Sequence, residues 1–164
     1  MIKNFEELKK MSCDCSKCLS AKFTGADGKR HMVLCGGTGC ISSNSNEIMA
    51  EIQKQIKERG LEDKVTVNQV GCFGFCSQGP FVKIYPEDTL YRMVTLDDVN
   101  EIMEKDIIGG ETIERLLYID PNTEEKVSKQ EDITFYKKQH RIALNGCGSI
   151  NPEKIEEALG AGAF

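Results

Sequence analysis

Two pairs of cysteines constrain this chain of 164 residues more than any other feature. Cys35 and Cys40 have four residues between them, and Cys72 and Cys76 have three. Both pairs lie in glycine-rich stretches, and the residues between the pairs have the pattern of one helix followed by one strand. In open α/β sheets, the loops that bind ligands lie beyond the carboxyl ends of the strands. We therefore expect the four thiols to converge on one site.

Four thiolates supplied in two pairs predict a metal site, and their spacing favours a 2Fe–2S cluster. Iron and inorganic sulfide take soft sulfur ligands, and each of two bridged irons needs two thiolates. Neighbouring glycines let the backbone approach closely and point N–H groups at sulfur, which stabilises negative charge. The predicted cofactor and metal ligands are Cys35, Cys40, Cys72 and Cys76.

Other cysteine sites fit the spacing less well. Structural zinc also takes four cysteines but usually has two residues between the members of a pair, so zinc stays open as an alternative. A thioredoxin-type dithiol needs Cys-x-x-Cys, which neither pair has. A Rieske centre needs two histidine ligands, and the only histidines, His31 and His140, lie in neither loop. We expect both histidines to be surface or packing residues.

Composition limits the class of protein and its partners. A net charge of −5 leaves no basic patch for phosphates, so we expect no nucleic-acid partner. The sequence has no long apolar run, so we expect no membrane insertion. Residues Met1 to Lys10 lack the apolar core of a secretory signal. The eight cysteines are then thiols or metal ligands rather than disulfides, which indicates the cytoplasm.

The order of predicted elements is strand, helix, strand, strand, strand, helix, which favours an α/β fold with a parallel first pair of strands. Two helix starts are expected at capping boxes, Asn44 with Glu47 and Thr95 with Asp98. We expect a thioredoxin-like mixed sheet with flanking helices and a cis bond before Pro80. The expected segments are strands at 31–35, 64–70, 81–85 and 90–94, and helices at 44–60 and from residue 95.

Irregular extensions are expected at both ends of this fold. Residues 4–10 predict a short amphipathic helix, followed by a cysteine-containing leader. Gly109-Gly110 ends the regular pattern, and the tail has too few apolar residues for a core of its own. A short helix is expected after Pro152, with Ile155 and Leu159 on its apolar side.

The second cysteine loop makes a family resemblance specific. Cys-x4-Cys, a helix, a strand and then Gly-Cys-x-Gly-x-Cys-Ser-x-Gly-Pro resembles the thioredoxin-like 2Fe–2S ferredoxins, which include the small ferredoxin subunit of respiratory complex I. The resemblance covers about residues 30–108. It implies that the four cysteines named above are the cluster ligands, since they occupy the ligand positions of that motif.

The tail carries a second resemblance. Residues 114–118, 135–148 and 150–153 are similar to the lead-in of the NADH-oxidising flavoprotein subunit of complex I and of the beta subunits of NAD(P)-linked, electron-bifurcating iron-only hydrogenases. In those hydrogenase subunits a ferredoxin domain precedes the FMN and NAD(P)H sites. This chain has neither Gly-x-Gly-x-x-Gly nor a P-loop. We therefore expect a fragment that ends, at Phe164, before those sites.

These resemblances imply an electron-transfer module that binds one 2Fe–2S cluster and catalyses nothing alone. The full-length subunit would be an NAD(P)H-dependent oxidoreductase, with the other subunits of a hydrogenase or NADH-oxidoreductase complex as partners. The alternatives are a free-standing thioredoxin-like ferredoxin and a zinc-stabilised docking module without redox function. The expected domains are an N-terminal leader at 1–29, the ferredoxin domain at 30–108, and a linker with the start of a truncated flavoprotein region at 109–164.

Four further cysteines remain. Cys13, Cys15 and Cys18 have the density of metal ligands, and a zinc ion or an additional cluster would need a fourth ligand from Cys147 or a partner. The simpler interpretation is three thiols on a flexible leader. Cys147 is expected to be structural, near the junction with the flavoprotein region.

Overall fold

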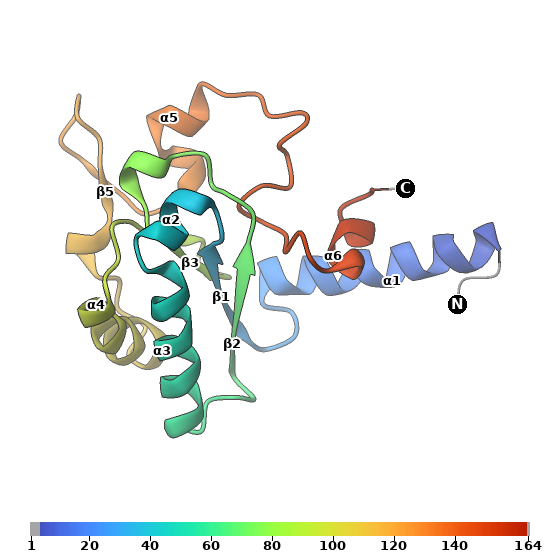
Figure 1. Ribbon diagram of the computed structural model, residues 1–164, viewed down its shortest axis with the longest axis horizontal. Coiled ribbons are helices and arrows are strands. Elements are labelled where there is room, and N and C mark those ends of the chain that lie inside the picture. Colours follow the sequence, from blue (N-terminus) through green and yellow to red (C-terminus); the bar gives the residue numbers. More distant parts are fainter. Residues whose placement is uncertain (1–3, 164) are drawn as a thin grey trace.

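A four-stranded mixed sheet lies at the centre of the computed structural model, which describes residues 4–163 (Figure 1). The strand order is β2-β1-β3-β4, and β1 and β2 are parallel while the other two pairs are antiparallel. This arrangement is the predicted thioredoxin-like sheet. The helices and strands are α1 (Phe5–Thr24), β1 (Arg30–Cys35), α2 (Thr38–Ser42), α3 (Ser45–Glu58), β2 (Val65–Val70), β3 (Val82–Tyr85), β4 (Thr89–Tyr91), α4 (Leu96–Glu101), β5 (Tyr118–Ile119), β6 (Lys126–Val127), α5 (Thr134–Lys137) and α6 (Ile155–Gly160).

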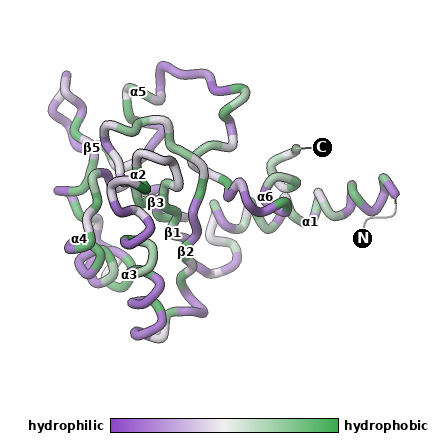
Figure 2. Tube along the Cα trace, in the orientation of Figure 1, coloured by the Kyte–Doolittle hydropathy of each residue, from purple (hydrophilic) through white to green (hydrophobic). Residues whose placement is uncertain are grey.

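The strands of the sheet carry side chains into two separate cores. On β1, Met32 and Leu34 pack with α3 and α4, whereas Val33 and Cys35 point into a second core on the opposite face. This alternation follows from the two-residue repeat of a strand. Figure 2 shows the hydrophobic residues gathered along the inner strands and the hydrophilic ones along the outer parts of α1 and α3. On α3, Ile48, Ile52 and Ile56 repeat every four residues and are buried, with Met49 partly buried beside them.

The two predicted helix starts have different outcomes. At α4, Thr95 and Asp98 form the predicted capping box, with the Thr95 N–H donating to Asp98 Oδ2 at 2.7 Å. At α3, Asn44 is the N-cap residue, but its side chain makes no capping hydrogen bond, so the predicted box with Glu47 is wrong. The reason is the preceding helix α2, which sequence reasoning assigned to a loop. It ends at Ser42, and the tight turn into α3 gives Asn44 a left-handed φ of 65°.

The prolines that flank β3 both follow cis peptide bonds. The Gly79–Pro80 bond is cis, as the sequence predicts, and the Tyr85–Pro86 bond is cis as well. After α4 the chain continues as a π-helical stretch from Ile102 to Ile108.

The N-terminal segment is one continuous helix rather than a short helix with a flexible leader. Helix α1 begins at the N-cap residue Asn4, whose Oδ1 accepts a hydrogen bond from the Glu7 N–H at 2.9 Å, and ends at Gly25 with a left-handed φ of 68°. Neither glycine nor proline interrupts the sequence between these residues. No helix among the described residues is both long and apolar enough to cross a bilayer.

The C-terminal extension docks on the sheet domain and on α1. Figure 1 shows α6 lying alongside α1, and the two helices are in contact. Lys22 joins them, because its Nζ donates to Glu157 Oε2 at 3.0 Å and to the Ser149 carbonyl at 3.1 Å. On α6, Leu159 is buried as predicted, but Ile155 is exposed, so that part of the prediction is wrong.

The same extension follows the outer edge of β4. The Leu90 N–H donates to the Ser128 carbonyl at 2.8 Å, and Thr89 forms an isolated antiparallel bridge with Lys129. From there the chain crosses the second core, where Ile133 and Tyr136 are buried against residues of the sheet. The extension therefore covers a sheet edge and a sheet face.

The Lys22 contact predicts a specific effect on α1. Lys22→Ala leaves the half-buried Glu157 carboxylate without its cation, and breaking a buried pair in this way typically costs about 3–5 kcal/mol. We expect faster amide hydrogen exchange in α1 and α6, measured by mass spectrometry. The control is Lys17→Ala, which removes an exposed lysine paired with Asp14 and should change stability by less than about 0.5 kcal/mol. Equal exchange in the two variants would contradict the assignment.

Candidate metal centre

The two cysteine loops leave the same end of the sheet. The parallel register pairs Cys35, the last residue of β1, with Val70, the last residue of β2. The first loop continues into α2, which carries Cys40, and the second reaches a single 3-10 turn that begins at Cys76. Cys35 and Cys40 are almost fully buried, Cys72 is half-buried and Cys76 is exposed. The site therefore has a buried inner pair and an outer pair at the surface.

The sulfur atoms of both pairs converge. Cys72 Sγ and Cys76 Sγ are 3.7 Å apart. A Cβ placed on Gly37 would lie 3.0 Å from Cys72 Sγ and 3.5 Å from Cys35 Sγ, so sulfurs from both loops surround one point. The structure thus brings together the four cysteines that the sequence singled out.

Backbone N–H groups point at these sulfur atoms. The Gly74 N–H donates to Cys72 Sγ at 3.3 Å. The N–H groups of Gly37 and Phe73 donate to the Cys35 thiol, and each lowers its pKa. Such donors stabilise thiolate charge and tune the potential of an iron–sulfur cluster.

A hydrogen bond links the two thiols of the inner pair and shifts their pKa values in opposite directions. A hydrogen bond from Cys40 is the main cause that lowers the pKa of Cys35 to about 6. The same hydrogen bond, together with burial, raises the pKa of Cys40 well above its usual range. Burial also raises the pKa of Cys72. A metal that takes these sulfurs as thiolates must displace the Cys40 and Cys72 protons, so loading releases protons.

The donor set fits a cluster of two irons. Four cysteine sulfurs in two pairs, with each pair from its own loop, match the two thiolates that each iron of a 2Fe–2S cluster takes. The chemistry and grouping of the donors therefore fit this cluster.

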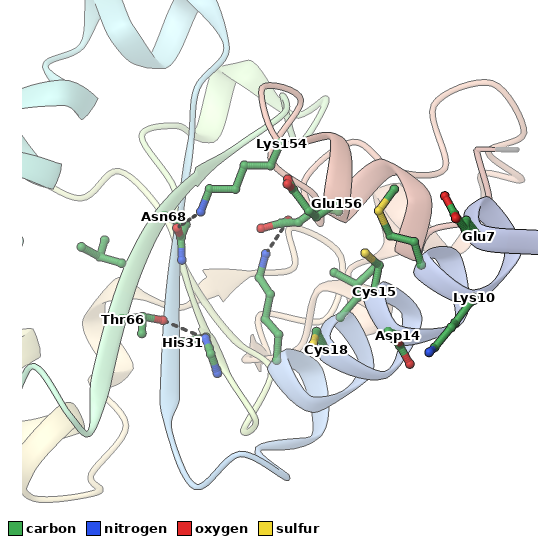
Figure 3. Close-up of a pocket in the computed structure, with 15 residues that line it drawn as sticks. Glu7, Lys10, Asp14, Cys15, Cys18, His31, Thr66, Asn68, Lys154 and Glu156 are labelled. Atoms are coloured by element: carbon green, nitrogen blue, oxygen red, sulfur yellow. Dashed lines mark hydrogen bonds and ion pairs between the residues drawn. The ribbon is translucent and has the colours of Figure 1, made fainter. Parts of the chain in front are cut away.

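The cysteines of α1 do not form a comparable site. Cys15 and Cys18 are three residues apart and line a groove of about 690 Å³ between α1, α6 and β2 (Figure 3). Cys13 precedes Cys15 by two residues, which in a helix puts it on another face. The helix thus separates Cys13 from Cys15 and Cys18, whereas a flexible leader would have left all three thiols free to meet. The pKa of Cys15 is raised, mainly by loss of solvation and then by the neighbouring Cys18.

Two other residues that the sequence raised, His31 and Cys147, have packing roles in the described chain. His31 is buried, with its Nε2 2.8 Å from Asp27 Oδ2 and its Nδ1 2.7 Å from Thr66 Oγ1. Cys147 lies next to the second cysteine loop, where a Cβ on Gly71 would be 3.8 Å from its Sγ. Cys147 therefore borders the site rather than completing one on α1.

Sequence reasoning missed the part of the C-terminal extension that contacts the second cysteine loop. The Tyr136 hydroxyl donates to the Phe73 carbonyl at 3.2 Å. The N–H of Gly71 donates to the Ile150 carbonyl, and its carbonyl accepts from the Gly148 N–H, each at 3.1 Å. The one sequence signal was the Phe135-Tyr136 aromatic pair within a charged segment, because such rings usually bury against a core.

A thioredoxin-like mixed sheet with two cysteine loops at one end defines a class of iron–sulfur protein, and comparisons with known proteins name the family. The family model described as "Thioredoxin-like [2Fe-2S] ferredoxin" matches residues 21–106. The chain belongs to this family. It binds a 2Fe–2S cluster and is an electron-transfer module.

Individual relatives agree with this assignment. The chain is 49% identical over 77 residues to "Ferredoxin, 2Fe-2S" of Clostridium pasteurianum, which covers 47% of this chain and 76% of the relative. The solved structure of a thioredoxin-like [2Fe-2S] ferredoxin from Aquifex aeolicus has a TM-score of 0.50 and 31% identity, over 54% of this chain and 88% of that one. The match with one subunit of the NADH-quinone oxidoreductase of Rickettsia conorii has 32% identity and covers 48% of each chain.

The glycines of the site predict a matched pair of variants. A Cβ on Gly79 would lie 2.6 Å from Cys40 Sγ, whereas a Cβ on Gly39 would meet only Cys76 Cβ at 3.8 Å. Overpacking typically costs about 1–3 kcal/mol. We therefore expect Gly79→Ala to weaken cluster retention roughly 5- to 150-fold, and Gly39→Ala to leave it near the wild-type value. Iron released to a chelator over time measures the effect, and equal release from the two variants would contradict it.

Proposed function

We propose that Cys35, Cys40, Cys72 and Cys76 hold the 2Fe–2S cluster and that the domain carries one electron at a time. The observation that supports this most strongly is the convergence of the four sulfurs with backbone N–H donors around them. When bound, the cluster accepts and returns one electron. The protein supplies the thiolates, the N–H donors and the buried surroundings that set its potential.

The two pairs contribute differently to this role. Cys35 and Cys40 lie in the second core and fix the inner side of the cluster. Cys76 and Gly74 are exposed, so the outer pair is the side at which a redox partner can approach closely. Electrons would enter and leave by this side, since the inner side is covered by the sheet.

We also propose that the domain works within an NAD(P)H-linked hydrogenase or related oxidoreductase complex in the cytoplasm. The similarity to a protein named as a subunit of NADH-quinone oxidoreductase supports this, as do the flavoprotein-like motifs of residues 114–153. FMN and NAD(P) would bind outside the 164 residues of this chain. In this proposal residues 1–29 lead into the ferredoxin domain at 30–108, and 109–164 lead to the flavoprotein region.

A free-standing ferredoxin is the second candidate. It is supported by the relative named simply as a 2Fe–2S ferredoxin, of which 76% is covered. Purification from the natural source under anaerobic conditions distinguishes the two, because a complex carries FMN and NAD(P)H reduces its cluster, whereas a free ferredoxin has neither property.

Serine substitutions test the ligand assignment. We expect Cys→Ser at 35, 40, 72 or 76 to lower the iron and acid-labile sulfide bound per chain or to alter the electron paramagnetic resonance spectrum of the reduced protein, because serine replaces a soft sulfur ligand. Cys15→Ser is the control and should leave both measurements unchanged. Loss of the cluster in that control would overturn the assignment, as would a variant among the four with both wild-type iron and sulfide content and a wild-type spectrum.

A further inference from the structure

One hydrogen bond links the C-terminal extension to the middle of the second cysteine loop. Tyr136 lies in α5, outside the residues 21–106 that match the ferredoxin family. Its side chain is buried, and its hydroxyl donates to the Phe73 carbonyl at 3.2 Å. Its ring packs edge-on against Phe75, with centroids 6.1 Å apart. The residue is therefore held in place both by packing and by this bond.

The peptide that accepts this bond also donates to a cysteine. The Phe73 carbonyl belongs to the same peptide unit as the Gly74 N–H, which donates to Cys72 Sγ at 3.3 Å. In a trans peptide the C=O and N–H point in opposite directions. A donor that fixes the carbonyl on one side therefore aims the N–H on the other. Tyr136 and Cys72 hold the two ends of one planar group.

On the Gly74 side, no side-chain packing fixes the orientation of this peptide, whereas Phe73 is buried against Phe81. Gly74 is exposed with φ of +85°, and a Cβ built on it would have no neighbour within 4 Å. Glycine populates many backbone conformations, so the peptide would otherwise be free to turn. The contacts of Gly71 with Gly148 and Ile150 secure the start of the loop, not its middle.

We propose that Tyr136 is a positioning residue that aligns the Gly74 N–H with Cys72 Sγ and thereby raises the reduction potential of the cluster. The inference rests on the proposed ligand role of Cys72. Reduction adds one electron, supplied by the redox partner, and neither breaks a bond nor moves the Tyr136 proton. The N–H donor stabilises the added negative charge, and the hydroxyl strengthens that donor because linked hydrogen bonds polarise one another.

The surroundings of Tyr136 suit this role. The Arg141 guanidinium lies over its ring at 5.1 Å and also donates to the Cys147 carbonyl at 3.3 Å. Burial is the main cause that raises the pKa of Tyr136; the Arg141 guanidinium opposes this shift and the nearby cysteines add to it. The phenol thus remains a hydrogen-bond donor at neutral pH.

Tyr136→Phe removes the donor and keeps the ring. In mediated redox titration of the loaded protein, we expect reduction to become roughly three- to tenfold less favourable, a shift of about 30–60 mV to more negative potential at 59 mV per tenfold. The matched control is Tyr118→Phe, because the Tyr118 ring also packs on Phe75, with centroids 5.7 Å apart. The control should keep the wild-type potential.

A second readout separates alignment from general loosening. Hydrogen exchange should rise in the peptide that contains Gly74 and stay unchanged in α3. Site-specific 3-fluorotyrosine at position 136, a stronger donor than tyrosine, should shift the potential in the positive direction. This variant decides the question if Tyr136→Phe fails to retain its cluster.

Wild-type potentials in Tyr136→Phe or in the fluorotyrosine variant would overturn the inference. A shift in Tyr118→Phe equal to that in Tyr136→Phe would do the same, since the effect would then not depend on the Phe73 carbonyl. Failure of the proposed function is a separate result: Cys72→Ser would then keep a normal cluster. If that variant does lose its cluster, the Tyr136 comparison tests the positioning role alone.

Discussion

The parallel pairing of β1 with β2 is the contact on which the metal centre depends. It ends both strands at the same edge, with Cys35 opposite Val70, so that the two loops begin as neighbours. Each loop supplies only two sulfurs, and neither pair could hold a two-iron cluster alone. A shift in this register would separate the pairs while leaving each loop intact. The precision of the site therefore comes from the sheet more than from the loops.

The second core extends this dependence to residues far along the chain. Its members include Cys35 and Cys40 from the inner pair and Ile133 and Tyr136 from the C-terminal extension. A protein with a single core would leave the inner sulfurs against solvent on one side. Here the extension closes that side, and its contacts continue to Phe73 and Gly71 in the second loop. The surroundings of the cysteine site thus include residues from the C-terminal extension, which lies outside the residues 21–106 that match the family.

Local patterns in the sequence predicted most of the sheet, and contacts between distant segments account for the differences. The first strand, the helix α3 and the capping box of Thr95 and Asp98 depend on near neighbours, and the structure agrees with each. The docking of α1 on α6 involves Lys22 meeting Glu157 across the fold, which no local pattern contains. The ligand cysteines were visible because their chemistry is rare, whereas Tyr136 was not, since one buried tyrosine resembles any other.

The path of the extension also affects how copies of this protein behave toward one another. An unpaired strand at the border of a sheet is a template for pairing with a second molecule. Residues 128 and 129 bond to the outer side of β4. At the other border, formed by β2, the Ile150 carbonyl accepts a hydrogen bond from the N–H of Gly71, the residue after β2. The Lys154 ammonium donates to the side chain of Asn68 in β2. The C-terminal extension thus covers parts of both edges of the sheet, at β4 and at β2. This disfavours strand exchange between copies at high concentration.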